Sequence, residues 1–137
     1  MKPTKLDLQT ASIVESNDFI TMYLWSFLTQ AGIKGEIKYL ERKYAPGWCA
    51  YLFLTRDQLR KINFTEDENY YSYINSQFIN GEITFFEIQR DGTYKIGWDY
   101  LSMSQTEENS SHTFELVKND VENCAKEVIR LCKNSFL

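Results

Sequence analysis

The sequence predicts an α+β fold: a single domain with an antiparallel sheet of about four or five strands, formed by two hairpins. An N-terminal helix, a middle helix and a long C-terminal helix are expected to pack with this sheet. Three observations lead to this expectation. The 137 residues suffice for one core. Strand-like runs flank both Pro46-Gly47 and Asp91-Gly92. Apolar residues near the end step by four and three: Val117, Val121, Cys124, Val128 and Leu131.

The N-terminal part is expected to be an arm, residues 1–11, that is loose or docked, followed by a helix. Ser12 and Glu15 have the spacing of a capping box, and Gly32 is placed to end the helix, near Gln30, with a left-handed cap. At helical spacing, Met22 and Trp25 lie opposite the apolar stripe. Either the arm folds over these two side chains, or an intermolecular contact covers them, or they are simply exposed, as isolated surface apolar residues often are.

Residues 35–43 and 48–55 are expected to be strands around a type II turn with Pro46-Gly47 at its centre. The second strand is apolar at nearly every position, which indicates cover on both faces. A short helical turn is expected within residues 56–64. A further capping box, residues 65–68, predicts a helix through Ile79.

The second hairpin can be read in two registers, and polarity favours the one with a three-residue loop, residues 90–92, and Gly92 in the left-handed position. One face then pairs Ile88 with Tyr94, Phe86 with Ile96 and Thr84 with Trp98. The other pairs Glu87 with Lys95, Gln89 with Thr93 and Phe85 with Gly97. Phe86 is expected in the core, and Phe85 on the outer face near Ile83. Either Phe85 shields the bare glycine or this face receives a partner.

No catalytic, cofactor-binding or metal-binding set of residues is expected. The single histidine, His112, lies in a polar segment before a helix start, where a Ser–His pair lacks an orienting group. Cys49 and Cys124 are expected as small core residues, and the position of Cys132 stays open. One histidine with scattered cysteines makes a zinc site improbable.

Composition bears on partners and compartment. The net charge of −4 and the pI near 5.0 disfavour nucleic-acid binding. The basic run Lys34, Lys38, Arg42 and Lys43 is expected to be a solvated strand face. The longest apolar stretch, FITMYLWSFL, is shorter than the ~20 residues that span a bilayer, and no signal peptide is evident. Reduced cysteines then suggest a cytoplasmic protein without membrane contact.

The order of helix, hairpin, helix, hairpin and long C-terminal helix resembles the type III secretion chaperone fold and its YbjN-like relatives. The resemblance is best over residues 66–134, which include ENYYSYINSQFINGEITFFEIQRDGTYKIGWDYL. It implies a non-catalytic, often dimeric protein that binds another polypeptide. It carries over no functional residue.

The function expected from these observations is a protein-binding module that masks a partner protein, as an inhibitor, an immunity protein or a chaperone. The partner would be a toxin, an effector or a defence protein. The expected contact residues are Met22, Trp25, Ile83, Phe85 and Lys95. Some of them could serve a homodimer instead. The alternative is a small-ligand-binding or enzymatic domain with a pocket between sheet and helices.

Overall fold

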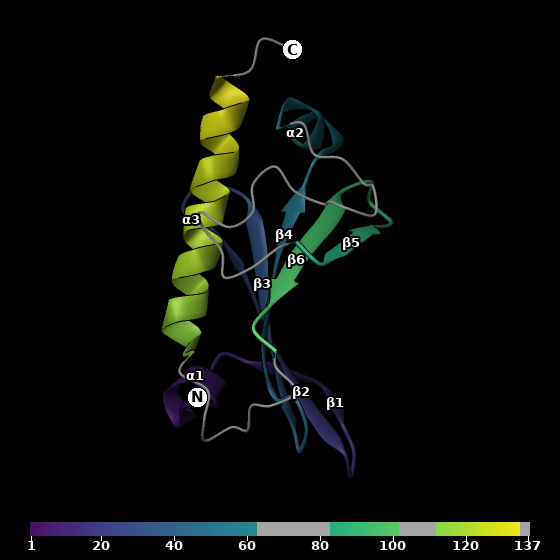
Figure 1. The fold of residues 1–137 in the computed structure, drawn as a ribbon, viewed down its shortest axis with the longest axis vertical. Helices are drawn as coiled ribbons and strands as arrows, with labels where there is room; N and C mark the ends of the chain where they lie inside the picture. The colour runs from purple at the N-terminus through teal and green to yellow at the C-terminus, as the bar shows by residue number, and fades with distance from the viewer. Residues whose placement is uncertain (63–82, 102–111, 135–137) are drawn as a thin grey trace.

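A computed structural model describes residues 1–62, 83–101 and 112–134, and Figure 1 shows how their elements are arranged. Six strands form one antiparallel sheet in the order β1-β2-β3-β4-β6-β5. The long C-terminal helix α3 lies along one face of this sheet. The α+β class and the long closing helix are therefore confirmed, but the sheet has six strands rather than four or five. The elements are α1 (Lys5–Leu8), β1 (Ser12–Ser16), β2 (Ile20–Leu28), β3 (Lys34–Arg42), β4 (Gly47–Leu54), α2 (Arg56–Lys61), β5 (Phe85–Ile88), β6 (Tyr94–Asp99) and α3 (Phe114–Lys133).

The N-terminal helix expected to end near Gln30 is wrong, because this segment forms the hairpin β1–β2. Its apolar residues satisfy both a helical and a strand pattern, since β2 packs side chains on both of its faces. Trp25 packs with the core beneath α3, while Met22 packs with a second cluster around Leu40. The β-branched and aromatic residues of ITMYLWSFL favour the strand. Gly32 does adopt a left-handed φ of 87°, but it follows a strand rather than a helix.

The N-terminal arm folds over Trp25, as one of the three alternatives had it, but not over Met22, which lies on the other face of the sheet. The short helix α1 begins with a capping box between Thr4 and Asp7. The indole N–H of Trp25 donates to the backbone oxygen of Asp7 at 2.8 Å, and the indole N–H of Trp48 donates to that of Met1 at 3.1 Å. The arm therefore supplies the hydrogen-bond acceptors that two buried indoles require.

The strands β3 and β4 confirm the first predicted hairpin, and β4 is buried at almost every position. The connection between them differs from the expected type II turn. Gly47 is already the first residue of β4, with a φ of 150°. The left-handed residue is Ala45, with a φ of 50°, which is uncommon for a residue other than glycine.

The helices that follow the strands agree with the sequence pattern where they are described. The expected helical turn within residues 56–64 is α2, capped by Thr55. Helix α3 begins after the cap Thr113. Four of the five expected stripe residues are fully buried, and Leu131 is half-buried. The helix expected from residue 65 through Ile79 lies outside the described residues.

The second hairpin has the register that polarity favours. Phe85 pairs with Gly97, Phe86 with Ile96, Glu87 with Lys95 and Ile88 with Tyr94. Phe86 packs against the core as expected. Ile83 was expected on the outer face but is buried in the core with 1% exposure. The strand alternation does not extend to Ile83, because β5 begins only at Phe85.

Aromatic rings fill the core where the arm, the sheet and the start of α3 meet. The ring centroids of Trp25 and Phe114 are 5.0 Å apart, and those of Trp48 and Tyr39 are 4.8 Å apart. Trp25 and Trp48 are themselves 5.6 Å apart. Such tilted pairs add to the free energy that burial of the large apolar areas already supplies.

We expect Trp25→Ala to lower the free energy of unfolding by about 3–5 kcal/mol, because it leaves a large cavity and frees the Asp7 carbonyl. Leu28→Ala is the matched control, since Leu28 lies on the same strand but is 72% exposed. The control should change stability by less than about 0.5 kcal/mol. Urea unfolding measures both variants. An equal, small effect of the two would contradict the burial of Trp25.

Candidate functional site

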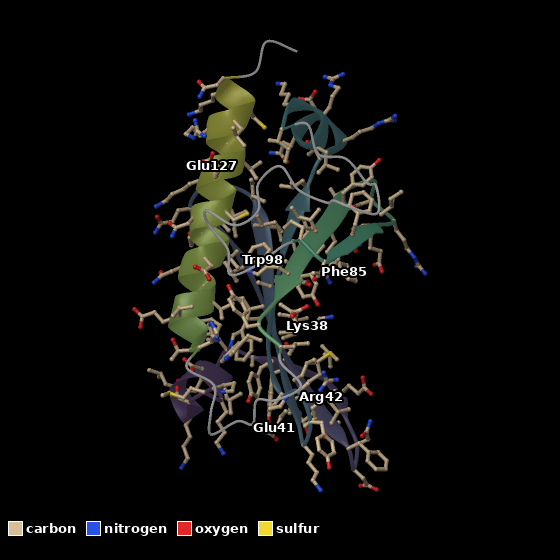
Figure 2. The ribbon with its side chains drawn as sticks, in the orientation of Figure 1. Lys38, Glu41, Arg42, Phe85, Trp98 and Glu127 are labelled. Carbon is tan, nitrogen blue, oxygen red and sulfur yellow. The ribbon has the colours of Figure 1, made fainter. Side chains whose placement is uncertain are left out.

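The sheet face opposite α3 is the candidate site, and we call it the outer face. Strands β3, β4, β5 and β6 place its central residues, which are Glu36, Lys38, Tyr51, Phe85 and Lys95. Leu40, Cys49 and Tyr51 form a small apolar cluster there, with Ile20, Met22, Phe85 and Leu101 packed around it. In Figure 2 the labelled Lys38 and Arg42 follow one another along the sheet, on the side away from α3.

Gly97 makes room for an aromatic pair on the outer face. A Cβ atom at this position would lie 2.5 Å from the Cδ1 atom of Tyr51 and 2.8 Å from the backbone oxygen of Ala50. The ring of Tyr51 therefore lies directly on the glycine backbone. Phe85 meets Tyr51 edge-to-face, with ring centroids 5.3 Å apart. Phe85 itself stays partly exposed, so shielding of the glycine falls mainly to Tyr51.

Lys95 joins this aromatic pair to an ion pair. Its ammonium lies 2.9 Å from a carboxylate oxygen of Glu36, and both side chains are nearly buried, at 12% and 11% exposure. The same ammonium lies 4.3 Å from the Tyr51 ring centroid and 5.8 Å from that of Phe85. Glu36 also accepts from the hydroxyl of Ser26 at 3.3 Å. Lys95 is thus held by one carboxylate and by aromatic faces together.

Lys38 is the second ammonium on the Tyr51 ring, 5.3 Å from its centroid. Burial lowers the pKa of Lys38, and the charge of Lys95 lowers it further, against a smaller opposite effect of Glu36. Among the residues that the structure describes, Lys38 forms no ion pair. A half-buried ammonium beside a second ammonium is a site that an incoming anionic group would stabilise.

Cationic residues continue along β3 on this face. Lys34, Lys38 and Arg42 recur every fourth residue, so all three point to the outer face. Lys34 lies over the ring of Phe53, 4.5 Å from its centroid. The outer face therefore combines a row of cations with half-exposed aromatic rings, although the whole chain carries a net charge of −4.

Three of the five predicted contact residues, Met22, Phe85 and Lys95, lie on the outer face. Trp25 and Ile83 do not, because both are buried in the core beneath α3. The sequence analysis missed Glu36, Lys38 and Tyr51 as members of one site. The signal that could have found them is the alternation of charged and apolar residues in KGEIKYLER, which faces Tyr51 across the hairpin β3–β4.

The described residues offer little acid–base or metal chemistry. Within the part of the chain that the structure describes, no three His, Cys, Asp or Glu side chains gather as a metal site. The ring of His112 packs against that of Tyr100 at an angle of 45°, with centroids 4.7 Å apart, rather than standing free in solvent. The hydroxyl of Tyr100 donates to Asp120 on α3 and accepts from the indole of Trp98. This polar chain ties β6 to α3.

The three cysteines are free thiols. Cys124 is buried in the core as expected, and Cys49 is buried beneath the outer face. Cys132 is half-buried, 3.9 Å from the backbone oxygen of Gln58. Burial raises the pKa of the Cys49 thiol to about 11, and the nearby charge of Asp99 raises it further. The outer-face thiol is therefore a poor nucleophile.

No helix among the described residues is long and apolar enough to cross a membrane. Neither a protein-family model, nor a curated protein, nor a solved structure matches the chain.

We expect Gly97→Ala to lower the free energy of unfolding by about 1–3 kcal/mol, because the new methyl group would overlap the Tyr51 ring and the Ala50 carbonyl. Measured in a Tyr51→Ala background, the same change should cost less, since only the carbonyl contact remains. Urea unfolding of the four proteins in this double-mutant cycle gives the coupling. An identical cost in both backgrounds would contradict the contact with the Tyr51 ring.

Buried Cys124 predicts a loss of stability in alkali. Burial raises the pKa of its thiol from 9.0 to about 12. The unfolded chain therefore loses this proton first. The contribution of the neutral thiol is complete below about pH 9 and declines as the pH rises toward about 12, by at most ~1.4 kcal/mol per pH unit. Cys124→Ala should flatten this decline in urea unfolding series. Parallel curves for the two proteins would refute the assignment.

Proposed function

We propose that this chain is a non-catalytic protein-binding module that masks a partner protein through its outer face. The observation that carries the proposal is the surface formed by Lys38, Tyr51, Phe85 and Lys95, in which the partly exposed ring of Phe85 meets the more deeply buried ring of Tyr51 beside two cations. Aromatic side chains in a polar surround are typical of the centres of protein interfaces.

The electrostatics of the outer face favour an acidic partner surface. Lys38 carries a charge without an ion pair among the described residues, and its lowered pKa reports the cost of holding that charge there. A carboxylate from a partner would relieve this cost. The rest of the chain is net acidic, so it would repel the same partner elsewhere and orient it toward the outer face.

The acidic groups of the outer face have structural partners, which supports a binding role over a catalytic one. Glu36 pairs with Lys95. Asp99 accepts from the Thr84 hydroxyl and from the Leu101 amide. A general acid or base would need a proton to exchange with a substrate, whereas these carboxylates hold the strands and the lysine in place.

The kind of masking we propose is that of an inhibitor or immunity protein against a toxin, effector or defence protein, or that of a chaperone. This part of the proposal rests on the resemblance of the sequence, best over residues 66–134, to the type III secretion chaperones and YbjN-like proteins. All of these roles use a preformed surface, and the outer face is built from regular strands.

Capture of a partner tests the proposal. The purified chain, immobilised through its C-terminus, should retain one dominant stoichiometric protein from an extract of its source cell. Phe85→Ala removes a partly exposed ring and Lys38→Glu reverses the unpaired charge. Each should weaken the affinity for that partner by about 30-fold, the equivalent of ~2 kcal/mol at an interface centre.

The matched control for Phe85→Ala is Leu116→Ala, which removes an exposed apolar side chain from α3. It should bind the partner as tightly as the unaltered chain. Circular dichroism confirms that each variant is folded before binding is compared. Unchanged affinity in both outer-face variants would exclude the outer face as the binding surface.

A further inference from the structure

Two exposed aromatic side chains border a hollow at one end of the sheet. Phe19, at the tip of the hairpin β1–β2, is 84% exposed, and Tyr44, in the connection between β3 and β4, is 65% exposed. Together with Arg42, Lys43 and Ala45 they line an open hollow of about 450 Å³. We call this the hairpin-tip hollow. Burial of two such rings would contribute several kcal/mol, so their exposure forfeits stability.

The tip that carries Phe19 is held by its own hydrogen bonds. The side-chain oxygen of Asn17 accepts from the backbone N–H of Phe19 at 2.8 Å and from that of Ile20 at 3.1 Å. The backbone N–H of Asn17 donates to the oxygen of Ile20 at 2.9 Å. These bonds fix the turn with the ring of Phe19 outside the core.

The β3–β4 connection, which also lines the hollow, is fixed as well. Ala45 has a left-handed φ of 50°, and its backbone oxygen accepts from the Nε atom of Arg42 at 3.1 Å. A non-glycine residue in this conformation costs on the order of 1 kcal/mol, and such residues are frequent at ligand-binding sites. The bond to Ala45 holds the guanidinium at the rim, and its two terminal nitrogens donate to no other residue that the structure describes.

The hollow carries positive charge that the described residues do not neutralise. Neither Arg42 nor Lys43 forms an ion pair within residues 1–62, 83–101 and 112–134. The ammonium of Lys43 lies 5.4 Å from the centroid of the Tyr44 ring. The hollow thus offers two cations next to two exposed rings. A carboxylate beside an apolar side chain matches this arrangement.

We propose that the hairpin-tip hollow binds an extended segment of the partner polypeptide in which an acidic residue stands next to an apolar one. This deepens the proposed function and rests on it, because Arg42 continues the row of Lys34 and Lys38 from the outer face to the hollow. A peptide fits better than a nucleic acid. A chain with a net charge of −4 repels a polyanion, whereas a single carboxylate needs only the local cations.

The test is a titration of the isotope-labelled full chain, followed by NMR, with three probes of equal length. The first is a short synthetic peptide that carries one glutamate next to a leucine among neutral residues. The second replaces the glutamate by lysine, and the third is single-stranded oligothymidylate. The glutamate peptide should shift the backbone amide signals of Phe19, Lys43 and Tyr44, and the lysine peptide should not.

Variants decide whether the hollow is responsible. Lys43→Glu and Tyr44→Ser should each raise the dissociation constant of the glutamate peptide by about tenfold. Ile88→Ser is the matched control, since Ile88 is a 62% exposed apolar residue on β5, outside the hollow, and it should leave binding unchanged. Thermal unfolding shows that each variant is folded.

Three results would overturn the proposal: no shift of the hollow's signals, an equal response to the lysine peptide, or tighter binding of oligothymidylate at the same residues.

The experiments distinguish failure of the hollow from failure of the outer-face proposal. If Phe85→Ala and Lys38→Glu leave partner capture intact while Tyr44→Ser weakens peptide binding as expected, the hollow stands without the outer face. If both outer-face variants lose capture while the hollow binds no glutamate peptide, only the hollow is refuted.

Discussion

One amphipathic helix covers one face of a six-stranded sheet, and this constraint shapes the described molecule. Helix α3 buries Val117, Val121, Cys124, Ala125 and Val128 against the sheet. A single helix is about 10–12 Å wide, and six strands span more than twice that width. The helix therefore cannot shelter the whole inner face. Among the described residues, the N-terminal arm closes the part around Trp25 and Trp48, and the outer face covers its backbone with its own side chains.

The outer face does so with long cationic side chains laid over rings. The ammonium of Lys95 lies over the ring of Tyr51, which in turn lies on Gly97. A nearly buried ion pair such as Lys95 with Glu36 adds little net stability, because desolvation opposes the attraction between the charges. An apolar pair would stabilise this face as well but would not discriminate between partners. The arrangement therefore fits a surface selected for recognition, as the proposed function requires.

The sequence predicted those elements that follow a single period or that lie beside a turn signal, as the doubly buried strand β4 does next to Pro46. The register of the hairpin β5–β6 followed from polarity, and the stripe of α3 followed from its spacing. Strand β2 was mistaken for a helix because it packs apolar residues on both sides, so its pattern fits either period. That error placed Met22 and Trp25 on one surface. In a strand, residues three apart point to opposite faces, and the structure separates them accordingly. The grouping of Lys38, Tyr51 and Lys95 depends on pairing between strands, which no local pattern contains.

The environment of the tryptophans has a spectroscopic consequence. All three, Trp25, Trp48 and Trp98, are at most 3% exposed, and each indole N–H has an acceptor within the chain. Their emission should therefore lie at short wavelength and move to the red when the arm or the junction of β6 with α3 opens. The emission should change little when a molecule binds to the outer face, because no tryptophan is exposed there. Intrinsic tryptophan fluorescence therefore reports whether this chain is folded. Binding to the outer face has to be followed with another chromophore.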